Sequence, residues 1–343
     1  MLKTFDEICT FPVVYDAYLA ARRGKRSKAA TAKYEAHALE NVSNLVYILR
    51  TQLYRPGPFH LFTVYEPKER LVQAPAFTDK VVQHALVDNV VYERLTRSFI
   101  LDNYASQIGK GLHFGLDRLS GFMTDYWNKH HTAEGWVLKR DVRKFFASID
   151  HDILKTKLLA LDFEPEIYTM LCNYIDSTDG LPLGYQTSQL FALLFLDQFD
   201  HYVKEVLRIR YYGRYMDDFF LIHPDKEYLQ FCLREIHAFM ASVNLELNEK
   251  THIFPLRNGI DFLGFHTYLT DSGKVIRKLR HNSVKKMRAK LRYWAKAYPK
   301  GEVDRDAILA SWQAWDAHAA HGNTWRLRQE IRQQVKEILK EDI

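Results

Sequence analysis

The sequence predicts an α+β fold, and three patterns carry this prediction. Runs rich in Tyr, Phe and Ile on both sides of Met216 and Asp217 are typical of a β-hairpin. Between Asp79 and Leu95, apolar side chains recur at the spacing of an amphipathic helix with one face in the core. After residue 274, basic and apolar residues alternate without a strong strand signal, which favours helices. Strands interleaved with helices in one chain are typical of the α+β class.

The other elements follow in chain order. The first 60 residues are polar and are predicted to be helical. Residues 136–142 are predicted to form a strand, and Asp150 is predicted to be the N-cap of the next helix. The apolar run from Gln189 to Phe199 predicts a buried helix, and residues 266–274 predict a turn.

The C-terminal part contains aromatic and histidine side chains whose role is ambiguous. Five aromatic residues there are interpreted as core side chains rather than base-stacking platforms, because Trp and Phe dominate the cores of small domains. They are Trp294, Tyr298, Trp312, Trp315 and Trp325. His281, His318 and His321 are interpreted as ordinary polar or capping residues, because no cysteine or carboxylate accompanies them as a metal ligand.

The charge and length are compatible with binding a polyanion. The chain has 343 residues, 47% hydrophobic content and a formal net charge of +6. This length suits two or three domains of about 100–200 residues each. Residues 274–300 contain eleven Lys or Arg and no Asp or Glu, and residues 22–28 form a smaller basic cluster. Residues 274–300 are interpreted as a track for phosphates rather than a solvated face, and residues 22–28 either as an RNA contact or as a loop.

Several other classes of protein are excluded by the sequence. The three cysteines, Cys9, Cys172 and Cys232, form no Cys-x-x-Cys pair, which excludes a zinc ribbon or a disulfide framework. The longest apolar run, residues 190–196, is far shorter than the ~20 residues of a membrane span. The N-terminus lacks the pattern of a signal peptide. We therefore expect a cytoplasmic protein without a membrane partner.

Adjacent carboxylates at the predicted hairpin tip indicate a chemical site. Asp217 and Asp218 repel each other unless a cation neutralises them, and a divalent cation with oxygen ligands is the natural partner. An arbitrary Asp-Asp pair is most often a solvated turn. Here, however, Asp141 ends a separate predicted strand and supplies a third carboxylate. Carboxylates that converge from different strands are what a two-metal phosphoryl-transfer site needs.

These motifs resemble those of reverse transcriptases. Asp141 is similar to the first catalytic motif of that family, and Tyr215-Met216-Asp217-Asp218 to the second. Five further segments match the family in its own order along the chain: residues 67–72, 103–111, 184–189, 245–251 and 262–265. The resemblance implies a right-hand polymerase with fingers, a palm made of an antiparallel sheet packed on helices, and a C-terminal helical thumb. The expected division is a helical region at 1–60, fingers and palm at 61–270, and the thumb at 271–343.

The resemblance also implies an activity and a set of site residues. It implies an RNA-directed DNA polymerase that uses two Mg²⁺ ions, with Mn²⁺ as an alternative. Asp141, Asp217 and Asp218 are the expected catalytic residues, and Asp141, Val142 and Asp217 the expected metal ligands. The expected nucleotide-binding residues are Lys68, Arg70, Phe146, Leu183, Gly184 and Lys250. The expected template–primer contacts are Gln189, Tyr215, Met216, Lys285, Lys286 and Arg288.

Three of these assignments compete with simpler interpretations. Leu183 alternatively only packs the palm, as apolar residues usually do. Phe146 is expected under the incoming sugar, where its ring leaves no room for a 2′-hydroxyl. Alternatively, Phe146 is a core aromatic beside Phe145, although alternation along a strand would bury only one of the two. Lys250 is expected to protonate pyrophosphate, or it is a surface lysine in a loop.

The segment around Gly184 narrows the resemblance further. Many reverse transcriptases carry Gln before this Gly and Pro after the Ser, whereas this chain has Leu183 and Gln189 at those places. That form, together with residues 311–324, resembles the reverse transcriptases of diversity-generating retroelements. These bacterial or phage enzymes copy a template RNA into cDNA with errors at adenines. The implied partners are template RNA, an RNA–cDNA hybrid, deoxynucleotides and an oligomer of an accessory variability protein. Gln107 departs from the family, because a basic residue is common there.

Other functions remain as alternatives. A group II intron maturase uses a similar core as an RNA-splicing scaffold, but it normally carries an extension beyond the thumb. A defence-associated reverse transcriptase fits the same motifs. A protein that only binds nucleic acid fits less well, because all three carboxylates are present.

Overall fold

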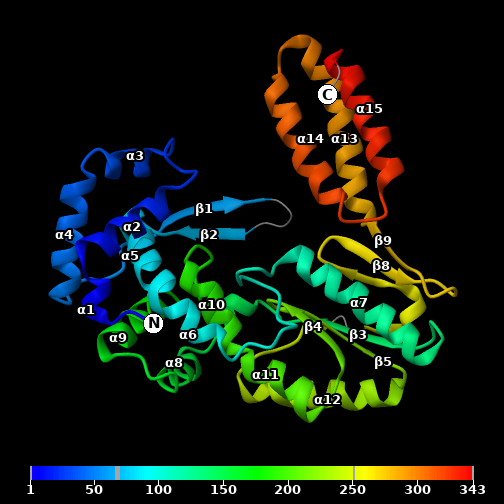
Figure 1. Ribbon diagram of the computed structural model, residues 1–343, viewed down its shortest axis with the longest axis horizontal. Coiled ribbons are helices and arrows are strands. Elements are labelled where there is room, and N and C mark those ends of the chain that lie inside the picture. The colour runs from blue at the N-terminus through cyan, green and yellow to red at the C-terminus, as the bar shows by residue number, and fades with distance from the viewer. Residues whose placement is uncertain (1, 66–69, 250–251, 342–343) are drawn as a thin grey trace.

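The computed structural model describes residues 2–65, 70–249 and 252–341. Figure 1 shows an N-terminal part with helices and a two-stranded sheet, a central part that contains the two larger sheets, and a C-terminal helical bundle. The helices are α1 Phe5–Ile8, α2 Phe11–Arg22, α3 Ala29–Glu35, α4 Ala38–Arg50, α5 Phe77–Leu86, α6 Tyr92–Thr96, α7 Leu112–His130, α8 His151–Leu159, α9 Pro165–Ile175, α10 Gln186–Phe195, α11 Asp197–His201, α12 Lys226–Ser242, α13 His281–Ala297, α14 Arg305–Ala319 and α15 Trp325–Leu339. The strands are β1 His60–Val64, β2 Arg70–Ala74, β3 Trp136–Asp141, β4 Tyr211–Tyr215, β5 Asp218–His223, β6 His252–Pro255, β7 Ile260–Phe262, β8 Phe265–Leu269 and β9 Val275–Leu279.

A four-stranded antiparallel sheet lies at the centre of the molecule. Its strand order is β4-β5-β3-β6, and β4 and β5 form the hairpin predicted from the sequence. Helix α12 packs on one face of this sheet, and α7 packs against β4 on the other face. Antiparallel sheets packed on helices, with the other helices around them, confirm the expected α+β fold.

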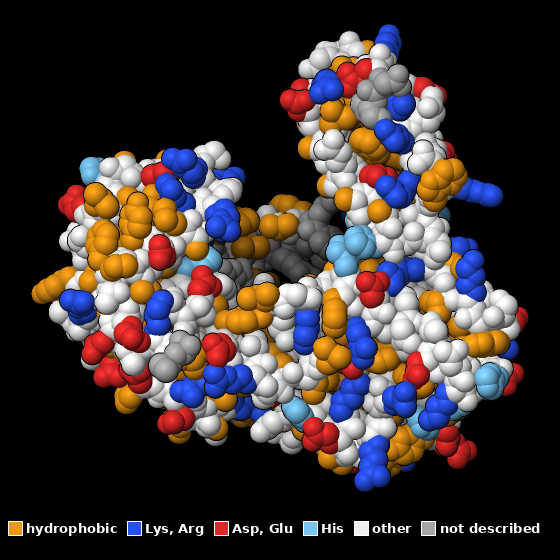
Figure 2. All heavy atoms as spheres, viewed as in Figure 1, with side chains coloured by type: hydrophobic (Ala, Val, Ile, Leu, Met, Phe, Trp, Pro, Cys, Tyr) orange, Lys and Arg blue, Asp and Glu red, His pale blue; other side chains and the backbone are white. Residues whose placement is uncertain are grey.

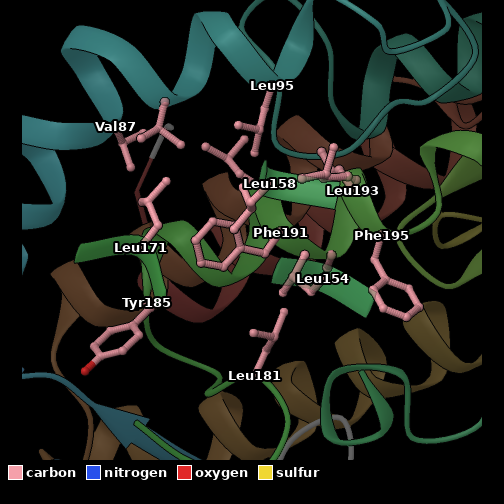
Figure 3. Close-up of a cluster of buried hydrophobic side chains, with 14 of the residues drawn as sticks. Val87, Leu95, Leu154, Leu158, Leu171, Leu181, Tyr185, Phe191, Leu193 and Phe195 are labelled. Atoms are coloured by element: carbon pink, nitrogen blue, oxygen red, sulfur yellow. The ribbon is translucent and has the colours of Figure 1, made fainter. Parts of the chain in front are cut away.

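The largest core joins the sheet to the helices on the N-terminal side. Figure 3 shows part of it, where Phe191 of α10 lies among Leu154 and Leu158 of α8, Leu171 of α9 and Leu95 of α6. All of these side chains are buried. Burying one such side chain stabilises the fold by roughly 1.5–3 kcal/mol, so α10 is held firmly against its neighbouring helices. The predicted buried helix from Gln189 is therefore confirmed, with its start at Gln186.

The first 60 residues are helical from Phe5 to Arg50, as predicted. The basic cluster at 22–28 spans the last residue of α2 and the loop before α3. Arg22 and Arg26 both form ion pairs with Glu35, so part of the positive charge of this cluster is neutralised within the chain.

The segment after Phe265 differs from its prediction. Residues 265–269 and 275–279 form strands β8 and β9 of a three-stranded sheet, and the turn is confined to 270–274. The prediction of a longer turn without strands was wrong because these strands bury polar residues. Thr267 of β8 and Arg277 of β9 are buried, and a buried basic residue disguises the alternation that indicates a strand.

The C-terminal bundle has a core of its own. Trp294 and Trp312 are buried in it with aliphatic residues from α13, α14 and α15, as predicted. Trp325 differs, because 69% of its surface is exposed at the start of α15. Figure 2 shows the surface hollowed between this bundle and the N-terminal part. None of the helices in the described part of the chain combines the length and apolarity that a bilayer crossing requires.

Candidate active site

Strand register brings the predicted carboxylates to one end of the central sheet. Asp141 of β3 lies directly opposite Asp218 of β5. Directly opposed residues of an antiparallel pair share a face, with Cβ atoms about 4.5–5.5 Å apart. Asp217 precedes Asp218 in the hairpin turn, and its carbonyl accepts a hydrogen bond from the Val142 backbone N–H at 3.3 Å. The chain segments that carry all three acids therefore meet at this point.

Two polar side chains contact these carboxylates. Lys139, two residues before Asp141 on β3, donates a hydrogen bond to Asp218 Oδ1. The Asn248 amide donates to Asp141 Oδ2 at 2.5 Å. Burial raises the pKa of Asp218, and the neighbouring Lys139 acts in the opposite direction. Sequence reasoning assigned neither residue to the site, although Asn248 lies in the matched segment 245–251 and Lys139 was detectable because residues i and i+2 of a strand share a face.

The donor set at this end of the sheet fits a hard divalent cation. Asp141 and Asp217 offer carboxylate oxygens and Val142 offers a backbone carbonyl, which are the ligand types that Mg²⁺ prefers. In the described residues, no group of three His, Cys, Asp or Glu side chains is arranged to hold a metal ion. Mg²⁺ is usually held by one or two carboxylates together with substrate phosphates, so a complete protein cage is not needed.

Phe146 follows Asp141 by five residues and lies on a different element from the one expected. Residues 145–148 form a single 3₁₀ turn rather than a continued strand. Phe145 is buried and Phe146 is half-buried, so one ring of the pair does face outward. The Phe146 carbonyl accepts a hydrogen bond from the Leu181 N–H at 2.7 Å, which joins this turn to the segment that carries Leu183.

Leu183 and Gly184 form a turn that packs against β2. A Cβ on Gly184 would lie 2.3 Å from the Gln73 carbonyl oxygen, so only glycine fits this approach. Leu183 is half-buried. Arg70 begins β2, whereas the predicted sites at Lys68 and Lys250 lie outside the described residues.

A pocket of about 690 Å³ lies beside the hairpin. It is lined by Gln189 and Tyr215, two of the expected template–primer contacts, and by the loop that carries Gln107 and Lys110. Gln189 is exposed and accepts a hydrogen bond from Ser106. Gln107 donates to the Asn103 carbonyl at 2.8 Å, so its amide holds the loop. Met216 is only 9% exposed and packs in the main core, so its side chain is less accessible to a template than expected.

The basic segment 274–300 divides into two kinds of residue. Lys285, Lys286 and Arg288 are exposed on α13, where they remain candidates for phosphate contacts. Arg288 also pairs with Glu330 of α15 at 3.1 Å. Arg277 is buried instead, and its guanidinium donates to the Leu116 carbonyl at 2.7 Å and to Asp117 at 3.0 Å. The interpretation of the whole segment as a phosphate track is therefore wrong at Arg277.

Comparison with known proteins assigns these features to one family. Residues 66–267 match the family of reverse transcriptases (RNA-dependent DNA polymerases). The chain is 25% identical to protein YkfC of Escherichia coli K12, and the match covers 63% of this chain and 69% of YkfC.

Solved telomerase structures share the fold. Telomerase of Candida albicans, solved with a fragment of telomeric RNA, matches with a TM-score of 0.52 and 12% identity over 90% of this chain. Apo telomerase of Candida tropicalis matches with a TM-score of 0.52 and 12% identity over 89% of this chain. The chain spans 66% and 62% of these two telomerase chains, which is less than two thirds of each.

Proposed function

The chain belongs to the reverse transcriptase family, whose members are RNA-dependent DNA polymerases, and we propose that it extends a primer along an RNA template. The observation that carries this proposal is the opposition of Asp141 and Asp218, with Asp217 beside them, at one end of the central sheet. Polymerisation is a phosphoryl transfer, in which catalysis is mainly positioning and charge neutralisation. The site offers both positioning and charge neutralisation.

The residues of the site have distinct proposed roles. Asp141, Asp217 and the Val142 carbonyl would hold Mg²⁺, with Mn²⁺ as an alternative, and the bound ions would acidify the primer hydroxyl and stabilise the departing pyrophosphate. Asn248 fixes one oxygen of Asp141 through its 2.5 Å hydrogen bond. Lys139 neutralises Asp218, which thereby supports the site's geometry. Lys68 and Arg70 are proposed to contact the triphosphate, and Lys250 to protonate pyrophosphate.

Replacing Asp217 tests the assignment. Asp217→Asn should abolish primer extension on RNA while leaving fold and RNA binding nearly unchanged, because it removes a charge and no core volume. The matched control is Asp271→Asn, in the exposed turn between β8 and β9. Activity would be measured with purified proteins whose fold is checked by circular dichroism. Extension by Asp217→Asn at a rate near that of the unaltered protein would refute the two-metal assignment.

We further propose that the enzyme makes adenine-mutagenised cDNA in a diversity-generating retroelement. The support is the form of the turn around Gly184, with Leu183 in place of Gln and with Gln189 after Ser188. A Gln amide at position 183 would hydrogen-bond the incoming nucleotide or its template neighbour, and such a bond is worth about 0.5–1.5 kcal/mol. Since about 1.4 kcal/mol is a tenfold ratio, its absence would raise misincorporation several-fold.

Leu183→Gln tests this finer proposal. The variant should lower errors opposite template adenine more than errors opposite the other bases. The measurement is sequencing of cDNA made by both proteins on one template RNA, with the accessory variability protein supplied. An adenine error rate that does not fall would show that Leu183 does not lower the fidelity of synthesis. Synthesis without a template would favour a defence-associated enzyme, and splicing of a bound intron would favour a maturase.

A further inference from the structure

The turn that carries Asp217 has a backbone that needs support. Met216 has φ 56°, in the left-handed region that a residue with a side chain rarely adopts. Such a conformation persists only where the surrounding structure holds it. The position and direction of Asp217 depend on this residue, because it is the next in the chain.

Arg214 holds this turn from inside the protein. Its side chain is fully buried, and its Nη1 donates a hydrogen bond to the Met216 carbonyl at 2.8 Å. The other side of the guanidinium makes two hydrogen bonds to Asp200 of α11, at 2.7 Å from Nε and 2.5 Å from Nη2. Asp200 is fully buried as well. One planar group thus joins the helix behind the sheet to the backbone of the turn.

Further hydrogen bonds fix the Asp200 carboxylate of this ion pair. The Tyr212 hydroxyl donates to Asp200 at 2.5 Å, and the Asn103 amide donates to it at 3.3 Å. Burial alone would lower the pKa of Arg214, but the Asp200 carboxylate outweighs that effect and the net shift is upward. The guanidinium therefore stays charged and keeps its planar set of donors.

The backbone of Arg214 is held by the loop that precedes α7. The Arg214 N–H donates to the Asp102 carbonyl, and the Tyr104 N–H donates to the Arg214 carbonyl, each at 2.9 Å. The Tyr104 ring lies against Gly213, where a Cβ would come within 2.3 Å of the Tyr104 hydroxyl oxygen. The strand is thus fixed just before the turn.

A buried ion pair of this kind is weak evidence for a role in stability. Replacing such a pair with apolar residues of similar volume is often neutral or stabilising, because both charges must be desolvated. The hydrogen bond to the Met216 carbonyl is different, because an apolar side chain cannot replace it. Its loss would release the turn without emptying the core.

We propose that Arg214 is a positioning residue, which is held by Asp200 and fixes the Met216 carbonyl so that Asp217 and Asp218 are presented for reaction. This inference rests on the proposed polymerase function. It adds a residue that touches neither substrate nor metal and acts through the turn.

The double variant Arg214→Met with Asp200→Leu tests this role, because it removes both buried charges and keeps most of the volume. We expect it to fold and to bind primer–template with an affinity within about twofold of the original, since most of the proposed contacts lie on α10 and α13 and not in this turn. The kcat should fall by about ten- to a hundredfold, because small misplacements of catalytic groups have effects of that size. The Mg²⁺ concentration for half-maximal rate should rise. The control is Arg328→Met with Asp316→Leu, which removes the ion pair between α15 and α14.

Arg214→Lys is a second variant, which tests the same role if the double variant is unstable. The lysine retains a positive charge beside Asp200, but it lacks the planar fork that reaches Asp200 and Met216 together. A lowered kcat with a raised Mg²⁺ requirement and unchanged primer–template affinity supports the proposal in either variant. An unchanged kcat and Mg²⁺ dependence overturns it, as does a loss of activity that only follows a loss of folded protein. An inactive unaltered protein would instead refute the proposed polymerase function.

Discussion

At the scale of single residues, the site depends on side chains that the carboxylate motifs do not include. Lys139 and Asn248 contact Asp218 and Asp141. Two neighbouring carboxylates repel each other when no cation is near. A lysine fixed on Asp218 lowers this repulsion within the protein. We propose that Asp141 and Asp217 are the acids that act on metal ions.

Phe146 gives a prediction about sugar selection at this scale. Its ring is half-buried, and its backbone is fixed to Leu181. Phe146→Ala should relax discrimination against ribonucleotides more than it lowers deoxynucleotide incorporation, because it removes the surface that would exclude a 2′-hydroxyl. Single-nucleotide extension with matched ribo- and deoxynucleotides measures the ratio. Phe145→Leu serves as a core control, and an unchanged selectivity ratio for Phe146→Ala would place residue 146 outside the sugar pocket.

The sequence predicted the acids better than their partners. Adjacent carboxylates between two apolar runs are a strong local signal, so the hairpin and the convergence of Asp141 with it followed from residue pattern and resemblance, whereas the register did not. Arg214 and Asp200 gave no such signal, because an arginine in a strand is read as exposed. Only packing reveals that both are fully buried. Partners that meet across long stretches of chain are set by tertiary contacts, which one sequence does not display.

At the scale of elements, three histidines join the C-terminal bundle to α7. The rings of His113 and His321 stack with centroids 3.3 Å apart, and His318 lies 4.8 Å from Phe265. The charged groups around them are Asp117 on α7 and Arg277 on β9, and His318 comes from α14. The interpretation of His318 and His321 from sequence missed this cluster, because His113 lies some two hundred residues earlier in the chain.

This cluster predicts a loss of stability in mild acid. Burial lowers the pKa of His318, and His113 and His321 lower it further. The unfolded chain therefore binds more protons than the folded chain over the interval between the lowered pKa and the ordinary value of about 6.5. Stability from the neutral cluster is present above about pH 6.5 and falls as the pH drops through that interval.

Thermal unfolding at about pH 8 and about pH 5.5 checks this expectation. His318→Asn should show a smaller drop in melting temperature between the two pH values than the unaltered protein. His281→Asn, at the exposed start of α13, is the matched control and should behave like the unaltered protein. Equal drops for all three proteins would contradict a role for the cluster.

The same junction explains why β9 was missed. Its central residue, Arg277, is buried and donates to the Leu116 carbonyl and to Asp117 on α7, and the Arg277 N–H donates to Asn323 at 2.8 Å. Charge pattern alone assigns such a residue to solvent. The helices were easier to predict, because the periodic spacing of their apolar residues is a local sequence pattern, as between Asp79 and Leu95.

At the scale of the whole molecule, the chain surrounds a hollow that lies between the N-terminal part and the C-terminal bundle (Figure 2). The end of the sheet that carries Asp141 and Asp218 belongs to the central part between them (Figure 1). We propose that these three parts are the helical region, the fingers and palm, and the thumb. A template–primer duplex in the hollow would meet basic residues from more than one of them.

This arrangement predicts that primer–template binding is sensitive to salt. Each phosphate contact contributes a log–log slope of about 0.7–0.9, because the nucleic acid releases counterions. Replacing Lys285, Lys286 and Arg288 with Ala should reduce the slope by about two, less than three full contacts, because Arg288 is already paired with Glu330. Binding titrations over a series of salt concentrations measure the slope.

A second triple variant tests the other basic segment and serves as a comparison of equal charge. Arg23, Lys25 and Lys28 are exposed at the end of α2 and before α3. If this cluster is a solvated loop, replacing these residues with Ala should leave the slope unchanged, and a shallower slope would make it an RNA contact.

For the α13 variant, a loss of affinity with an unchanged slope would mean that Lys285, Lys286 and Arg288 act through the folding of the bundle. The slope separates the two roles because only the loss of a phosphate contact changes the number of counterions released.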